Sequence, residues 1–140
     1  MRGFSLVEAL IVLAILGTLL AVGSVGLLGY LQTTRLNQAR QEVATALRLV
    51  GNKALTESRP YTVSVQTGTP AQIRWAPTGS SSISGNIIVP YDVRIASVTP
   101  SGPIQYVGRG FPVQQYTLTL QLGPRSTTVV LLPTGKVVTP

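Results

Sequence analysis

The feature that most constrains this chain is an uncharged apolar run near its N-terminus, from Ala9 to Leu31. As an α-helix rising about 1.5 Å per residue, this run spans roughly 35 Å, which is enough to cross the ~30 Å hydrocarbon core of a bilayer. It is too long for the apolar part of a cleaved secretory signal, which has about 7–15 residues. The sequence therefore predicts a membrane-spanning helix, and an ordinary signal-anchor is an open alternative.

A single carboxylate, Glu8, stands at the start of this run. A lone charge at membrane depth is costly and usually has a specific partner. No Lys or Arg lies nearby on the same helix face. The pattern therefore predicts that the partner of Glu8 lies elsewhere, for instance in another molecule.

The composition argues against catalysis. The 140-residue chain contains neither His nor Cys, which removes the commonest general base, the commonest metal ligand and any disulfide. No two of its four acidic residues stand at metal-ligand spacing. We therefore expect a protein that is not an enzyme and that has no metal, no cofactor and no small-molecule substrate.

A resemblance to a known family is carried by residues 3–17, which read GFSLVEALIVLAILG. This segment resembles the class III signal of type IV prepilins and pseudopilins. The resemblance implies that residues 1–3 are a leader peptide, that a prepilin peptidase cleaves after Gly3, and that Phe4 becomes the N-methylated mature N-terminus. It also implies that Glu8 neutralises the N-terminal amine of a neighbouring subunit, so that Phe4 and Glu8 carry filament docking.

The same resemblance implies partners and a location. The partners are other pilin or pseudopilin subunits along the N-terminal helix, the prepilin peptidase, the assembly platform of the inner membrane, and membrane lipid. A transmembrane helix over residues 4–31 would cross the inner membrane once, with the N-terminus cytoplasmic and the head extracytoplasmic. After assembly, the subunit would lie in a pilus or pseudopilus, in the periplasm or at the cell surface.

The helix is expected to continue through residues 32–58 as an amphipathic segment and to end at Arg59-Pro60. Apolar residues recur at steps of three and four within a stripe of about 100°. Polar residues occupy the opposite face, either as a solvated surface or as a contact between subunits. The stripe consists of Leu36, Ala39, Val43, Ala46, Leu47, Val50 and Ala54, and the polar face of Gln38, Gln41, Thr45, Arg48 and Asn52.

Residues 59–140 are expected to form a globular, β-rich head. From Tyr61 onward the pattern alternates with a period of two, which is typical of half-buried antiparallel strands. Thr127–Leu132 favours a central strand, and Pro133–Lys136 predicts a turn into a hairpin with Lys136–Val138. About eighty residues of sheet cannot bury a large core alone. The apolar stripe of the helix is therefore expected to form the second layer of the core. The predicted fold is α+β, with one long N-terminal helix packed on a C-terminal antiparallel sheet, as in the pilin fold. The other predicted strands lie at Tyr61–Gln66, Ile73–Trp75, Val93–Ile95 and Tyr116–Leu122.

A second resemblance covers roughly the last forty residues. Gln105–Gly110, the two predicted strands that follow, and the closing Thr134–Val138 look like the C-terminal half of the GspH/FimT family of minor pilins and pseudopilins. The absence of Cys fits such a minor subunit better than a disulfide-closed major pilin. The implied function is structural, in the assembly of a type IV pilus or a type II secretion pseudopilus. A stand-alone membrane-anchored binding domain that needs no cleavage is a further alternative.

The net charge of +7 allows a second function. The simpler explanation is a solvated surface that is attracted to anionic lipid headgroups. The alternative is a pilus-associated minor pilin that binds DNA during uptake for natural transformation, since some members of the resembled family bind DNA. Its candidate phosphate contacts are Arg74, Arg94, Arg109, Arg125 and Lys136.

Overall fold

The computed structural model describes residues 3–140, so the first two residues of the predicted leader lie outside the described residues. The described chain divides into an N-terminal unit, which ends at Thr33, and a head unit, which begins at Thr34. One helix runs through both units and is followed by strands alone. The elements are α1 (Leu6–Glu57), β1 (Tyr61–Gln66), β2 (Gln72–Pro77), β3 (Gly85–Ile88), β4 (Arg94–Thr99), β5 (Ile104–Tyr106), β6 (Tyr116–Leu122), β7 (Arg125–Leu131) and β8 (Val137–Val138).

The N-terminal unit consists of a short non-helical stretch and the first part of α1. Every large apolar side chain of this part is exposed, and none of the residues from 3 to 35 is buried. A helix that is apolar all round and unburied belongs in a membrane or against partner helices. Among the described residues, α1 is the one helix long and apolar enough to span a bilayer. That α1 crosses a membrane stays a prediction. The end of the membrane-spanning segment at residue 31 and the end of the amphipathic segment at residue 58, as domain boundaries, also stay predictions.

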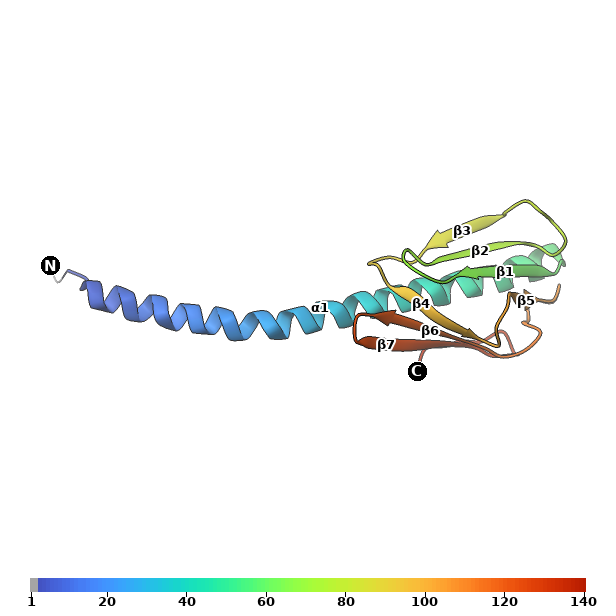
Figure 1. The fold of residues 1–140 in the computed structure, drawn as a ribbon. Coiled ribbons are helices and arrows are strands. Elements are labelled where there is room, and N and C mark those ends of the chain that lie inside the picture. The colour runs from blue at the N-terminus through green and yellow to red at the C-terminus, as the bar shows by residue number, and fades with distance from the viewer. Residues whose placement is uncertain (1–2) are drawn as a thin grey trace. The chain divides into compact units, whose positions relative to one another are not determined.

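The head unit contains two four-stranded antiparallel sheets and the second part of α1. The strand orders are β3-β2-β1-β5 and β4-β6-β7-β8, and we call these sheets A and B. Figure 1 shows β2 and β3 of sheet A above the head part of α1, and β4, β6 and β7 of sheet B below it. Two hydrogen bonds confirm that the helix meets both sheets. The hydroxyl of Tyr106 in β5 donates to the carbonyl of Leu47 at 3.0 Å, and Arg48 donates to the carbonyl of Val137 in β8 at 3.3 Å.

The core of the head unit forms where the apolar stripe of α1 meets the inner faces of the sheets. All seven stripe residues predicted from the sequence are buried, and all five residues of the predicted polar face are exposed. Ala44 is buried as well, because the two sheets cover a wider face of the helix than one sheet would. Every buried residue lies between Leu36 and Val137, so the head unit contains its whole core.

The fold class is confirmed, with two sheets where the sequence predicted one. β6 pairs with β7 from Tyr116↔Leu131 to Leu122↔Arg125, and β7 lies centrally between β6 and β8, as predicted. The predicted hairpin to β8 also forms. β3 and β5 were not predicted, because four and three residues are too few for a period of two to stand out.

The helix ends as predicted, just before Pro60. Ser58 takes a left-handed conformation with φ of 50°, and the N–H of Arg59 reaches back to the carbonyl of Ala54 at 3.1 Å. The N–H of Ser58 donates to the carbonyl of Leu55 at 3.2 Å. Together these bonds form a Schellman motif, with Ser58 at the position that glycine usually occupies.

Candidate functional site

The predicted processing and docking residues lie in the short stretch that precedes α1. Gly3, Phe4 and Ser5 are not helical, and the helix begins at Leu6. Phe4 is 82% exposed, and a Cβ added at Gly3 would meet no atom within 4 Å. The peptide bond between Gly3 and Phe4 is therefore open on both sides.

A reciprocal cap fixes where the helix starts. The Oγ of Ser5 accepts a hydrogen bond from the N–H of Val7 at 3.2 Å. The Oε2 of Glu8 accepts one from the N–H of Ser5 at 3.1 Å. This is the arrangement of a capping box, in which an N-cap Ser and a Glu three residues later satisfy backbone donors that the helix leaves free, with the Ser bond made here to the second helical residue, Val7, and not the third.

This cap gives Glu8 a hydrogen-bond partner that the sequence analysis did not predict, and a charged partner in another molecule stays a prediction. Its carboxylate has a partner in its own chain, the backbone N–H of Ser5. Lys and Arg are not the only partners open to a carboxylate, since the start of a helix leaves backbone N–H donors unsatisfied. The signal was present in the sequence, since Ser5-x-x-Glu8 directly before an apolar run is the pattern of a capping box. The second oxygen, Oε1, has no hydrogen bond or ion pair to any residue from 3 to 140.

The five cations proposed for DNA contact do not form one cluster. Arg74 lies on β2 of sheet A and donates to the side chain of Gln72, with a closest distance of 2.8 Å. Arg94 lies on β4 and donates to Gln121, at 3.1 Å from its Nε. Arg125 begins β7 and pairs with Leu122, the neighbour of Gln121, so it lies at the same end of sheet B as Arg94. Each of these three comes from an exposed position.

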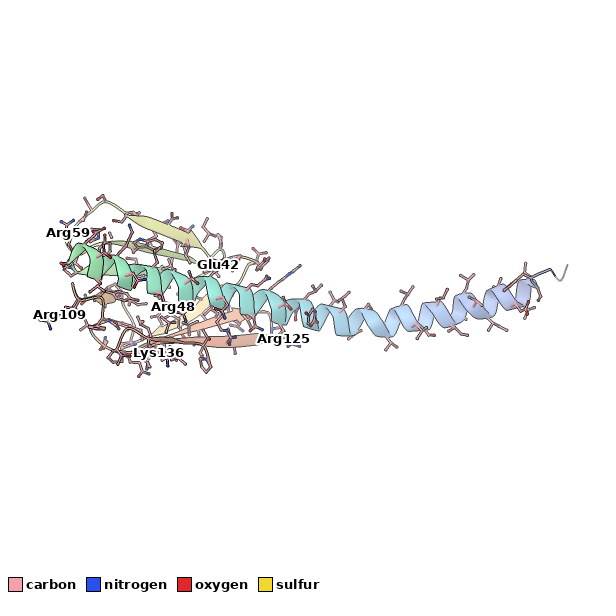
Figure 2. The ribbon with its side chains drawn as sticks, turned by 180° about the vertical axis from the view of Figure 1, so that it is seen from behind. Glu42, Arg48, Arg59, Arg109, Arg125 and Lys136 are labelled. Atoms are coloured by element: carbon pink, nitrogen blue, oxygen red, sulfur yellow. The ribbon has the colours of Figure 1, made fainter. Side chains whose placement is uncertain are left out.

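The remaining two cations, Arg109 and Lys136, come from turns at the other end of sheet B. Lys136 follows the end of β7, and the seven residues of that strand separate it from Arg125 by about 20 Å. Figure 2 shows Arg109 and Arg125 at opposite ends of the head unit. The five cations thus lie at separate places on the head unit, and DNA contact by these residues stays a prediction.

The sequence motifs in these turns have structural roles. The N–H of Gly110 donates to the carbonyl of Val107 at 2.9 Å, which closes a turn, and Gly110 has φ of 82°. A Cβ at Gly108 would lie 3.0 Å from the carbonyl of Ser58, so the turn packs closely on the end of α1. Gly108-Arg109-Gly110 is thus a turn, as the sequence indicated.

Comparison with known families agrees with the N-terminal segment. Residues 1–29 match the prokaryotic N-terminal methylation motif. No curated protein matches the chain in sequence.

Comparison with solved structures agrees with the fold. The type IV minor pilin FimU of Pseudomonas aeruginosa, in its P21 crystal form, matches with a TM-score of 0.66 and 10% identity, over 79% of this chain and 92% of that one. Its P65 form matches with a TM-score of 0.61 and 10% identity, over 75% and 92%. The minor pseudopilin EpsH of the type 2 secretion system of Vibrio cholerae matches with a TM-score of 0.55 and 12% identity, over 76% and 96%. The chain therefore carries the methylation motif and has the fold of a minor pilin or minor pseudopilin.

Proposed function

We propose that this chain is a minor pilin or minor pseudopilin, a structural subunit that takes part in assembling a type IV pilus or a type II secretion pseudopilus. The observation that carries the proposal is the joining of two features in one chain. The methylation motif at residues 1–29 leads directly into a head unit with the fold of FimU and EpsH. The motif supplies processing and anchoring, and the head supplies the body of a filament subunit.

Processing by a prepilin peptidase would occur between Gly3 and Phe4. This bond precedes the first helical residue, and Phe4 is almost fully exposed. Exposed, non-helical chain is where proteases act most readily, because its backbone is not engaged in hydrogen bonds. Cleavage there would leave Phe4 with a free amine for methylation.

Docking would pair Glu8 of one subunit with the amine of Phe4 on its neighbour. The cap holds Glu8 by one oxygen, and within residues 3–140 no group engages Oε1, which the incoming cation would contact. Opposite charges attract strongly in a low-dielectric surrounding, and either charge is costly when left there alone. The exposed apolar surface of the N-terminal unit would lie in inner-membrane lipid before assembly and against other subunits afterwards. The head would remain extracytoplasmic, and the assembly platform would be a further partner.

The first test is the native N-terminus. Mass spectrometry of the protein from a host with prepilin peptidase is expected to find a methylated Phe4 at the N-terminus. An intact Met1 in the membranes of such a host would contradict the filament assignment and favour a stand-alone anchored domain.

The second test separates the two roles of Glu8. Glu8→Gln retains the capping box, since Gln serves there as well as Glu, but it removes the charge. We expect this variant to be cleaved normally and to enter filaments at least about tenfold less often, because the neighbouring amine loses its counter-charge. Incorporation at the wild-type level would mean that Glu8 acts as a cap alone.

A further inference from the structure

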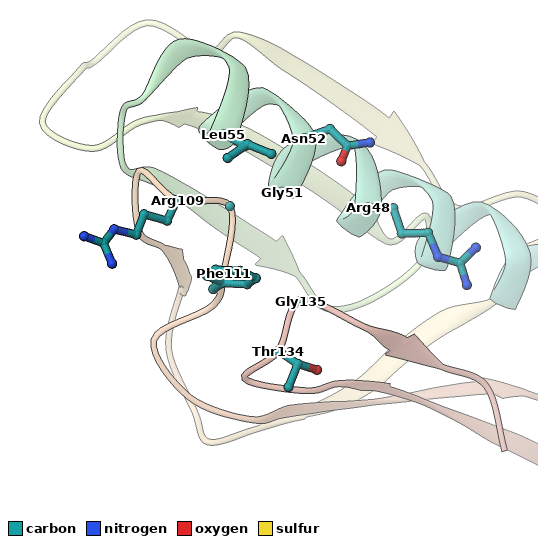
Figure 3. A pocket seen from close by; sticks show the side chains of 9 residues that line it. Arg48, Gly51, Asn52, Leu55, Arg109, Phe111, Thr134 and Gly135 are labelled. Atoms are coloured by element: carbon teal, nitrogen blue, oxygen red, sulfur yellow. The ribbon is translucent and has the colours of Figure 1, made fainter.

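A groove with a volume of about 490 Å³ runs along the exposed face of α1 in the head unit. Its walls are the last turns of α1, the β5–β6 loop and the β7–β8 turn, as Figure 3 shows. We call it the helix groove. Neither processing nor docking through the N-terminal segment uses this site.

The middle of the helix groove is apolar and open to solvent. Leu55 from the helix and Phe111 from the loop line it, and they are 57% and 46% exposed. Each could be unremarkable alone, since single exposed apolar residues are normal on protein surfaces. Here the two come from distant parts of the sequence and line one concavity, which is the usual form of an anchor site for an apolar side chain.

Close glycine contacts make the groove a built feature of the fold. A Cβ at Gly110 would lie 2.8 Å from the carbonyl oxygen of Gly51, so the loop touches the helix backbone there. A Cβ at Gly135 would lie 3.3 Å from the ring of Phe111, so the β7–β8 turn fits against that ring. The walls are therefore held by backbone packing, and a ligand would meet a preformed shape.

The ends of the groove are cationic. Figure 3 shows the guanidinium groups of Arg48 and Arg109 at opposite ends, on either side of Phe111. Arg48 makes one hydrogen bond, to the carbonyl of Val137 at 3.3 Å. Arg109 has no hydrogen bond or ion pair within residues 3–140, and no acidic side chain lines the groove. Guanidinium groups bind carboxylates in a bidentate manner, so both ends favour an acidic ligand.

We propose that the helix groove binds an acidic segment of another protein, with an apolar side chain against Leu55 and Phe111 and carboxylates at Arg48 and Arg109. A second copy of this chain does not fit that description. Its acidic residues, at positions 8, 42, 57 and 92, are all far apart, so it has no segment with an apolar residue between two acids. Arg2 and Glu8 precede the head unit, which leaves it with ten basic and three acidic residues and makes two heads repel. The proposal rests on the head unit alone and does not depend on the filament assignment.

The experiment uses residues 34–140, which contain the whole core, labelled with ¹⁵N for NMR titration. The probe is a blocked pentapeptide, Asp-Glu-Leu-Glu-Asp, and its control is Asn-Gln-Leu-Gln-Asn. We expect the acidic peptide to shift the amide signals of Gly51, Gly110 and Gly135 and to bind at least about tenfold more tightly than the neutral one, with an affinity that falls as salt rises. Failure of the acidic peptide to bind, or signal changes away from these three glycines, would overturn the proposal.

Matched charge reversals show whether binding is local. Arg109→Glu is expected to weaken the acidic peptide about tenfold or more, whereas Arg74→Glu, the same charge change on the outer face of sheet A, should have little effect. Phe111→Leu is a milder test of the apolar anchor and should weaken binding a few fold without altering the salt dependence. Equal losses from Arg109→Glu and Arg74→Glu would show non-specific attraction and refute the groove.

A ten-nucleotide oligothymidylate is the second probe, and tighter binding of it than of the peptide at the same glycines would replace the peptide partner with nucleic acid.

Discussion

The two parts of α1 differ in what surrounds them, although they form one helix. From Leu6 to Thr33, no side chain is buried, and the apolar residues occupy the whole circumference. From Leu36 to Ala54, the buried residues, all of them apolar, keep to one face, and that face is covered by two sheets. The contrast shows that the distribution of apolar residues around a helix matches the surroundings of that helix. An apolar stripe requires a protein core, and an apolar circumference requires lipid or other helices.

The largest expected difference between the two parts of α1 is in the effect of a Leu→Ala substitution on the stability of the head unit. Leu47 is fully buried, so Leu47→Ala should lower the free energy of unfolding of the head unit by about 3 kcal/mol. Leu19 is 64% exposed, and Leu19→Ala should leave that free energy unchanged. Urea unfolding of the full chain in mild detergent, followed by the fluorescence of Trp75, the single tryptophan, would measure both. A loss of similar size from Leu19→Ala would break the comparison, because it would couple the N-terminal unit to the stability of the head.

A glycine in each part gives the next largest effect. Gly110 has φ of 82° and lies against the backbone of Gly51, so Gly110→Ala should destabilise the head unit by about 2 kcal/mol. Gly23 lies in the N-terminal helix, where a Cβ would meet no atom within 4 Å. Gly23→Ala should therefore leave the head unfolding midpoint in place and raise the helix content by circular dichroism. A neutral Gly110→Ala would show that the loop is not packed on α1 as described.

A smaller effect is expected where the helix meets β5. Tyr106→Phe removes the hydrogen bond to the carbonyl of Leu47 and should cost about 1 kcal/mol at neutral pH. Burial, and to a lesser degree the neighbouring Tyr116, raise the pKa of Tyr106. Its hydroxyl thus stays protonated in the folded head after an unfolded tyrosine has ionised, near pH 10. The stability that this difference provides is complete below about pH 10 and is lost as the pH rises further. Wild-type protein should therefore lose stability more steeply above pH 10 than Tyr106→Phe does, and parallel pH profiles would contradict this assignment.

The smallest expected effect is a gain at the end of the helix. Ser58 pays for a left-handed conformation that glycine adopts freely, so Ser58→Gly should stabilise the head unit by about 0.5 kcal/mol. Thr56→Gly, two residues earlier in the helix, is the matched control and should destabilise it by about 0.3 kcal/mol. Changes of the same sign in both variants would argue against the Schellman motif.

The helix, its buried face and the longer strands could be predicted because each depends on a local repeat. The steps of three and four from Leu36 to Ala54, and the alternation from Tyr116 to Leu122, are set by the geometry of the elements themselves. The division of the strands into two sheets could not be predicted, because alternation shows which face of a strand is buried and not which strand lies beside it. The burial of Ala44 follows from that division.

The candidate sites show the same limit. Gly3, Phe4 and Glu8 could be named from the sequence, because they stand in one short motif that the family comparison also matches. The helix groove could not, since Leu55, Phe111 and Gly135 belong to three segments that only the folded chain brings together. The sequence predicts Arg48 on the polar face of the helix and Arg109 as a DNA contact. Nothing in their spacing indicates that the two side chains lie at the two ends of one groove.

The capping box at the start of α1 has a consequence for the way this protein can evolve. One side chain, that of Glu8, sets the first turn of the helix and, in the proposed filament, also carries the docking charge. Selection on either property therefore acts on the same codon. Gln would keep the cap and lose the charge, whereas Asp would keep the charge on a side chain shorter by one methylene. Each of these two closest replacements impairs one of the two properties. Substitution at position 8 is therefore constrained by the helix start and by filament entry at once.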